Sequence, residues 1–138
     1  MSIRPCNKED LEQCEIIFNL PELASASGSN LSAGYLKNFI NDKYFLVATN
    51  KKQIIGAIYG ESLKAGGVMM WALAVDSQFQ EQGIGSKLLK AFEKNARAHK
   101  KSWVILHAST KTKASINFYK KHGYDIGNTY IECAKDLK

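Results

Sequence analysis

The sequence predicts a single α/β domain in which one mixed β-sheet is covered by helices. Three observations support this fold class. The chain has 138 residues, the length of one ordinary domain. Two neighbouring apolar segments, 44–49 and 53–61, are separated by a tight polar turn, which predicts an antiparallel hairpin. Further along, an amphipathic segment lies between two apolar segments, which predicts a β–α–β unit.

The first half of the chain is predicted to form a strand, two helices and the hairpin. Residues 3–6 suit an opening strand, and Asn7 can cap a helix over residues 8–19. The small, polar stretch 24–30 predicts a mobile loop. Ser32 can then cap a second helix before the hairpin begins.

The second half is predicted to complete the sheet around two further helices. Residues 68–75 are almost wholly apolar, as expected for a strand buried on both faces. Downstream we expect a helix, a strand, a helix and two closing strands, at 83–100, 103–107, 113–122, 124–125 and 129–134.

Charge and composition exclude several classes of function. The 19 Lys and Arg exceed the 13 Asp and Glu by +6, but they form no dense basic tract, so we expect no nucleic-acid partner. The longest apolar run, 66–75, is about half a membrane span, and the N-terminus lacks the apolar stretch of a signal peptide. We therefore expect a cytoplasmic protein without a membrane partner.

The cysteines predict no metal centre. There are three of them, Cys6, Cys14 and Cys133, with no CxxC pair, and the three histidines stand apart in the sequence. We expect reduced, buried thiols.

The most informative stretch is the loop that joins the apolar segment 68–75 to the helix at 83–100. It carries Gly83 and Gly85 at the start of that helix. The first N–H groups of a helix have no partner within it, and the helix dipole adds positive charge there, so this point can bind an anion. Neither a P-loop nor a Rossmann fingerprint matches, because the required lysine and first glycine are missing.

The same loop resembles the acetyl-CoA signature Gln/Arg-x-x-Gly-x-Gly/Ala of the Gcn5-related N-acetyltransferase (GNAT) family. Gln80, Gly83 and Gly85 occupy its fixed positions, and residues 116–124 are similar to the family's Phe-Tyr-x-Lys-x-Gly-Phe segment. The resemblance covers the whole chain, 1–138. It implies a single GNAT-like domain with a mixed, mostly antiparallel sheet that splays at its centre and is flanked by helices.

The resemblance also implies an enzyme, an acetyl-CoA-dependent N-acetyltransferase, whose co-substrate would account for part of the positive charge. Its cofactor-binding positions would be Leu73, Ala74, Val75, Gln80, Glu81, Gln82, Gly83, Ile84, Gly85, Ser86 and Thr112. Many members have Arg or Lys in the loop where this chain has Glu81, so we expect that carboxylate to point into solvent. Thr112 stands where relatives often have an asparagine.

Acetyl transfer to an amine needs a proton donor for the departing thiolate and an acceptor for the amine's proton. Tyr119 occupies the family's usual position for the donor, and a phenol is protonated at neutral pH. Its alternative role is core packing. His107 matches a position where relatives carry a glutamate base; a structural histidine, Glu61 or a water remain alternatives.

The amine acceptor is not encoded in any recognisable motif; a protein N-terminus, a lysine, a polyamine and a small-molecule amine all remain open. The resemblance allows a homodimer without identifying its face. The three cysteines lie outside both motifs, which favours direct attack by the amine over a covalent acetyl-enzyme. The alternative function is a non-catalytic, acyl-CoA-binding regulatory module.

Overall fold

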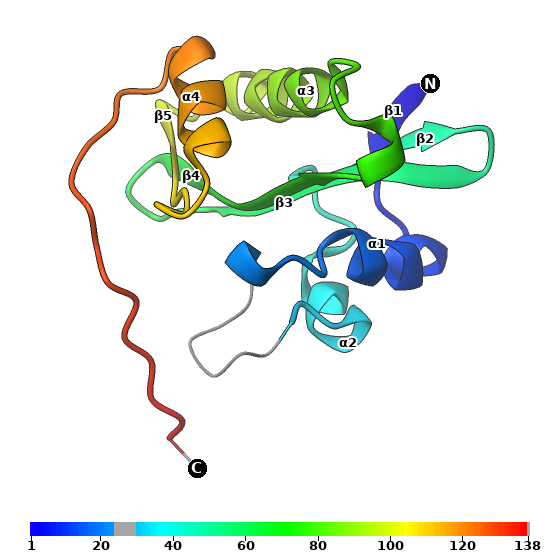
Figure 1. Cartoon of the computed structure of the whole chain (residues 1–138), viewed down its shortest axis with the longest axis horizontal. Helices are drawn as coiled ribbons and strands as arrows, with labels where there is room; N and C mark the ends of the chain where they lie inside the picture. The colour runs from blue at the N-terminus through cyan, green and yellow to red at the C-terminus, as the bar shows by residue number, and fades with distance from the viewer. Residues whose placement is uncertain (24–29, 138) are drawn as a thin grey trace.

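The computed structural model describes residues 1–23 and 30–137 and shows one open sheet between two layers of helices (Figure 1). The predicted loop at 24–30 therefore lies almost wholly outside the described residues. The strands are β1 (Ser2–Pro5), β2 (Phe45–Asn50), β3 (Gln53–Ser62), β4 (Gly67–Val75) and β5 (Trp103–Leu106). The α-helices are α1 (Leu11–Ile17), α2 (Ala33–Leu36), α3 (Ile84–Ala98) and α4 (Lys113–Lys121), with short 3-10 helices at Lys8–Asp10, Pro21–Leu23, Lys37–Phe39 and Ser77–Phe79.

The sheet has the order β1-β2-β3-β4-β5. The first three pairings are antiparallel, whereas β4 and β5 run parallel. The parallel pair covers only Gly67–Met70 of β4, matched with Trp103–Leu106. Because β4 continues to Val75 after β5 has ended, the sheet opens between these strands. The predicted mixed, mostly antiparallel sheet is confirmed, and its splay lies between the last two strands of the described sheet rather than at its centre.

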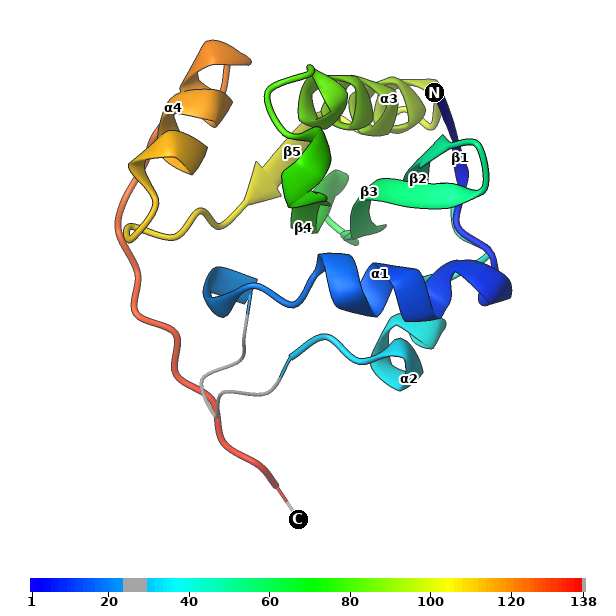
Figure 2. The same ribbon diagram turned by 45° about the vertical axis from the view of Figure 1, so that its right-hand side comes forward.

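Each face of the sheet carries its own hydrophobic core. Helices α1 and α2 cover one face, and α3 and α4 lie on the other (Figure 2). In the first core, the ring of Phe18 packs against those of Phe45 and Tyr59. In the second, α3 buries Leu88, Leu89 and Phe92. The two faces of the sheet therefore have separate hydrophobic cores.

The N-terminal cap of the first helix is built as predicted. Asn7 accepts a hydrogen bond from the Glu9 N–H, and the Asp10 carboxylate accepts one from the Asn7 N–H. Asp10 is buried and receives both guanidinium nitrogens of Arg4. These hydrogen bonds lower the pKa of the Asp10 carboxyl against the opposing effect of burial.

The structure corrects four expectations. β4 is fully buried on one face only, because Trp71 on the other face is exposed beside the splay. The second helix is a single turn followed by a 3-10 turn. Cys133 is exposed, while Cys6 and Cys14 are buried free thiols. Residues 124–125 and 129–134 form no strand, although their alternating pattern predicts one.

None of the helices within residues 1–23 and 30–137 is both long and apolar enough to cross a bilayer.

Candidate active site

Side-chain hydrogen bonds of its own residues stabilise the loop between β4 and α3. Asp76 caps the 3-10 helix Ser77–Phe79 by accepting from the Gln78 N–H, and its own N–H donates to the Ile55 carbonyl of β3. The side-chain amide of Gln80 donates to the Val75 carbonyl at 3.1 Å. The first residue of the glycine motif therefore ties the loop to the end of β4.

The start of α3 leaves its N–H groups available to an anion. The N-cap is Gly83, and no side chain caps this end of the helix. Gly83 has φ of +78°, a left-handed conformation that side chains with a Cβ rarely adopt. A Cβ added at Gly85 would contact Phe118 of α4 and Val75 of β4 at 3.6–3.7 Å, so this residue lies in the narrow seam between the two helices. Glu81 is exposed, as expected.

A histidine that the motif comparison did not single out contacts this loop. His122, at the C-terminal end of α4, lies 2.7 Å from the Phe118 carbonyl through Nδ1 and 2.9 Å from the Ser86 hydroxyl through Nε2. A carbonyl can only accept, so Nδ1 carries hydrogen and a neutral ring accepts the Ser86 proton at Nε2. These two residues are 36 positions apart, and no local pattern in the sequence connects them.

A small cavity lies in the splay, where β4 and β5 separate. Its volume is about 60 Å³, and both predicted catalytic residues line it. We call it the splay pocket; its wall includes Glu22, Trp71, Leu73, His107, Thr112 and Tyr119. Loops and helices from both halves of the chain thus bring the predicted donor, the predicted base and one predicted cofactor-binding position of β4 together.

Tyr119 is suited to donating a proton. It is buried, and this desolvation raises the pKa of its phenol to about 12, so the hydroxyl stays protonated at neutral pH. Its ring also packs edge-on against Phe118 and Tyr124. The structure therefore gives Tyr119 the core-packing role and leaves the same side chain on the wall of the splay pocket.

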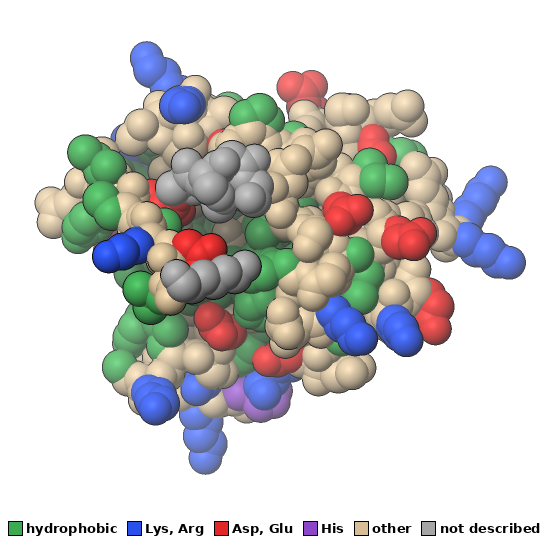
Figure 3. Space-filling view, turned by 90° about the horizontal axis from the view of Figure 1, so that it is seen from below, with side chains coloured by type: hydrophobic (Ala, Val, Ile, Leu, Met, Phe, Trp, Pro, Cys, Tyr) green, Lys and Arg blue, Asp and Glu red, His purple; other side chains and the backbone are tan. Residues whose placement is uncertain are grey.

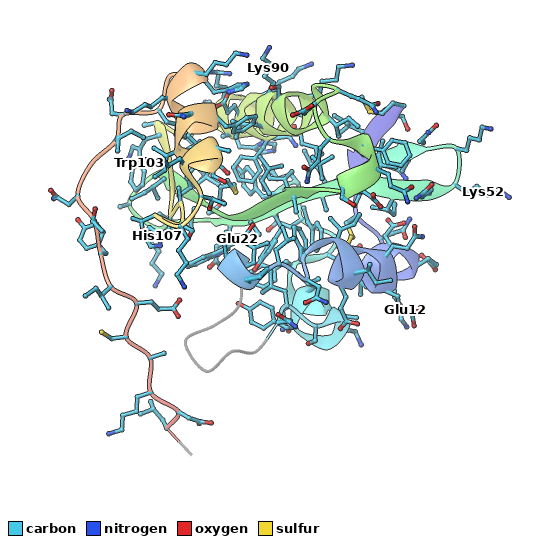
Figure 4. The ribbon with its side chains drawn as sticks, in the orientation of Figure 1. Glu12, Glu22, Lys52, Lys90, Trp103 and His107 are labelled. Atoms are coloured by element: carbon cyan, nitrogen blue, oxygen red, sulfur yellow. The ribbon has the colours of Figure 1, made fainter. Side chains whose placement is uncertain are left out.

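Three groups compete for the role of base. His107 is exposed and lines the pocket just after β5. Glu61 on β3 accepts a hydrogen bond from the Trp71 indole at 3.0 Å and is not among the pocket-lining residues. Glu22, in the 3-10 helix Pro21–Leu23, lines the pocket and was not predicted, because nothing in the local sequence places it opposite β5. Figure 4 labels both Glu22 and His107 near the open end of the sheet.

Thr112 lies on the pocket wall as the N-cap residue of α4, but its side chain caps no helical N–H. Its hydroxyl lies 3.5 Å from the Ser109 carbonyl, a weak contact at the limit of a hydrogen bond. Among the described residues, no three His, Cys, Asp or Glu side chains gather in a way that could hold a metal ion.

Comparison with known proteins identifies the class. A family model described as an acetyltransferase (GNAT) domain matches residues 41–126, more than half of the chain. The chain therefore belongs to the GNAT acetyltransferase domain family, which implies acetyl-CoA-dependent N-acetyltransferase activity.

Solved structures share the fold at low sequence identity. The ribosomal-protein-S18-alanine N-acetyltransferase of Escherichia coli is 18% identical with a TM-score of 0.76, over 92% of this chain and 79% of that one. Arabidopsis thaliana Naa50, solved with the bisubstrate analogue CoA-Ac-MVNAL, is 23% identical with a TM-score of 0.74, over 92% and 84%. An aminoglycoside acetyltransferase from an uncultured soil metagenomic sample is 22% identical with a TM-score of 0.72, over 99% and 96%. Their acceptors differ widely, so the fold alone does not specify one.

Proposed function

We propose that this protein transfers an acetyl group from acetyl-CoA to a primary amine by direct attack, without a covalent acetyl-enzyme. The observation that carries the proposal is the splay pocket. Its wall includes a protonated Tyr119, His107 and the part of β4 that pairs with β3 but no longer with β5. The buried cysteines, Cys6 and Cys14, are not among the residues that line it. The free thiols, one of them exposed, also suit the reducing cytoplasm, which is where we expect the protein to act.

The cofactor would lie along β4 and end at α3. Beyond Met70, β4 pairs with β3 on one edge, while β5 no longer covers the other. Backbone groups of residues 73–75 on that open edge can bond the amides of the pantetheine arm. The free N–H groups at the start of α3, within residues 81–86, would hold the pyrophosphate. Gln80 supports this loop through its bond to Val75.

His122 would position the Ser86 side chain at the phosphate site. Its Nε2 lies 2.9 Å from the Ser86 hydroxyl, and its Nδ1 lies 2.7 Å from the Phe118 carbonyl. The ring therefore links the C-terminal end of α4 to the first turn of α3.

The chemistry requires a neutral amine. Its nitrogen attacks the thioester carbonyl, the C–S bond breaks, and the Tyr119 phenol gives its proton to the departing thiolate. The proton lost by the attacking nitrogen passes to His107, directly or through water. Tyr119 then recovers a proton from solvent once the products leave.

The acceptor side of the pocket favours an amine that binds as a cation and loses one proton to solvent before its nitrogen attacks. Residues 1–62, which form β1–β3, α1 and α2, hold six basic and seven acidic side chains, whereas residues 63–138 hold thirteen basic and six acidic ones. Seen from below, many Asp and Glu side chains surround the centre of the face formed by the first half (Figure 3). Glu22 brings one carboxylate from this half to the pocket wall. A polyamine, a lysine or a protein N-terminus would match this charge.

A screen for free thiol across a panel of amines tests the proposal. The full chain is incubated with acetyl-CoA and each amine, and calorimetry measures acetyl-CoA binding in parallel. An enzyme releases thiol with at least one amine. Binding without thiol release from any amine would instead support the non-catalytic acyl-CoA-binding module.

A further inference from the structure

Trp71 is an extra residue in the pairing between β3 and β4. Tyr59 pairs with Ala72, and the next residue, Gly60, pairs with Met70, so β4 has a bulge at the residue between them. A bulge redirects the side chain that it carries. The Trp71 side chain is 41% exposed, whereas the other residues of β4 are buried or half-buried. It lies on the wall of the splay pocket.

A carboxylate holds this indole in place. The Trp71 Nε1–H donates to Oε1 of Glu61 on β3 at 3.0 Å. Because its N–H is already bonded, the indole offers only its ring to a ligand in the pocket. An aromatic face attracts an organic cation, and the negative charge of Glu61 at the ring edge adds to that attraction.

The opposite wall of the pocket supplies a second carboxylate in apolar surroundings. Glu22 is exposed, and Leu20 and Leu23 line the pocket with it. No cation within residues 1–23 and 30–137 is paired with Glu22. The volume of about 60 Å³ is far below the roughly 300–1,000 Å³ of sites for drug-sized ligands. Such a pocket suits an unbranched aliphatic chain better than a ring.

The reaction and the pocket make opposite demands on the charge of the acceptor. The attacking nitrogen must be neutral, whereas Glu22 and the Trp71 ring favour a cation. A single nitrogen cannot satisfy both demands in the reacting complex. A diamine satisfies them together, because the nitrogen near His107 loses a proton while the distant nitrogen keeps its charge.

We propose that Trp71 determines acceptor specificity by binding the distant ammonium group of an unbranched diamine whose other nitrogen attacks the thioester. Glu61 acts through Trp71 as a positioning residue. This inference rests on the proposed function and keeps its chemistry. The C–N bond forms as the C–S bond breaks, His107 takes the amine's proton, and Tyr119 gives one to the thiolate. The products are a mono-acetylated diamine and free coenzyme A.

The indole N–H signals in NMR spectra test this site without requiring turnover. The chain has two tryptophans, Trp71 and Trp103, with exposures of 41% and 42%, and Trp103→Leu assigns their signals. The probes are 1,4-diaminobutane and 1-aminopentane, which match in length and differ in one terminal charge. With coenzyme A present, the diamine should shift the Trp71 signal at an at least about tenfold lower concentration than the monoamine. Equal midpoints, or equal shifts of both indole signals, overturn the proposal.

Thiol release measures the same discrimination during turnover. The kcat/KM of the wild type should be at least about tenfold higher for the diamine than for the monoamine, and Trp71→Leu should reduce this ratio to about threefold or less. Trp103→Leu, at a tryptophan outside the splay pocket, is the matched control and should keep the ratio. The ratio is the readout because a general loss of activity lowers both values together. An unchanged ratio in Trp71→Leu contradicts the assignment.

Two substitutions of Glu61 test its positioning role. Glu61→Leu removes the acceptor of the indole hydrogen bond and should lower the diamine-to-monoamine ratio. Glu61→Gln keeps an oxygen that accepts this bond and should retain more of the ratio. If both variants keep the wild-type ratio, Glu61 does not position the ring.

The outcomes separate this inference from the proposed function. Thiol release at equal rates with the diamine and the monoamine leaves acetyl transfer standing and overturns the diamine site. A peptide α-amine or a lysine side chain that reacts faster than the diamine overturns it as well. If no amine releases thiol, the proposed function is wrong, and the indole titration still decides whether Trp71 binds a diamine.

Discussion

The two halves of this chain differ in net charge and in the part of the candidate active site that each one forms. Residues 1–62 are slightly acidic and build the side of the sheet covered by α1 and α2, whereas residues 63–138 carry the whole positive excess and build β4, α3, β5 and α4. In the proposed function, the second half offers backbone N–H groups and cations to an anionic cofactor, and the first half offers Glu22 to an amine. The net charge of +6 therefore comes from the second half of the molecule and is not spread evenly over its surface.

The largest expected effect comes from the proposed proton donor, Tyr119. Tyr119→Phe keeps the ring and its packing but removes the hydroxyl. Turnover should fall on the order of 10²-fold, with cofactor affinity within a few-fold of wild type. Because the pKa of Tyr119 is raised to about 12, wild-type turnover should show no loss from its ionisation up to about pH 10. Steady-state kinetics with any accepted amine measures both effects.

Tyr124→Phe is the matched control, since Tyr124 also lies beside α4 but donates to Glu93 outside the splay pocket. It should retain turnover. Full turnover in Tyr119→Phe would leave that residue with a packing role only.

The cofactor half should lose acetyl-CoA affinity when its loop is crowded. Gly85→Val would place a Cβ against Phe118 and Val75, in the seam where we propose that the pyrophosphate approaches. Calorimetry should show at least a tenfold weaker Kd, about 1.4 kcal/mol. Gly34→Val on the acceptor side, where an added Cβ meets only Ser32 at 3.9 Å, should bind acetyl-CoA normally. If the two variants bind acetyl-CoA with equal affinity, the loop before α3 is not part of the cofactor site.

His107 should set the acidic limb of the pH profile. Only a neutral imidazole can accept the amine's proton, so kcat/KM should fall when the solution is made acidic. His107→Ala should lose that limb, and His107→Gln, which keeps polarity and approximate size, should lose activity nearly as much. If His107→Gln is fully active and its pH profile is unchanged, a water rather than His107 accepts the amine's proton.

The smallest expected effect concerns the acidic half. Glu22→Gln should raise the KM of a cationic amine about three- to fivefold at low salt, with kcat nearly unchanged, because an exposed carboxylate contributes about 1 kcal/mol or less. The difference should shrink as ionic strength rises. Glu12→Gln, an exposed carboxylate of α1 outside the pocket, should leave KM unaffected.

The sequence was most informative where structure is determined locally. The Asn7 cap, the β2–β3 hairpin and the glycine loop before α3 each depend on residues a few positions apart, and each appears as predicted. The contacts that were missed are long-range. Ser86 and His122 meet only because α4 packs beside α3, and Glu22 reaches the pocket only because of how the chain continues after α1.

The wrong predictions have a similar origin. Alternation in residues 129–134 reports β-propensity, but a strand needs an edge to pair with, and in this structure the segment pairs with no strand. The apolar run of β4 predicted burial on both faces, yet the splay exposes Trp71. In both cases the local pattern was read correctly and the tertiary surroundings decided the outcome.

Backbone amide NMR shifts during two separate titrations test most directly the claim that the halves bind different substrates. Acetyl-CoA should shift resonances of residues 73–75 and 81–86, whereas an accepted amine should shift those of residues 20–23. The two sets should meet only around the splay pocket, near His107 and Tyr119. Shifts in α1 and α2 on adding acetyl-CoA, with the loop before α3 unchanged, would contradict the account.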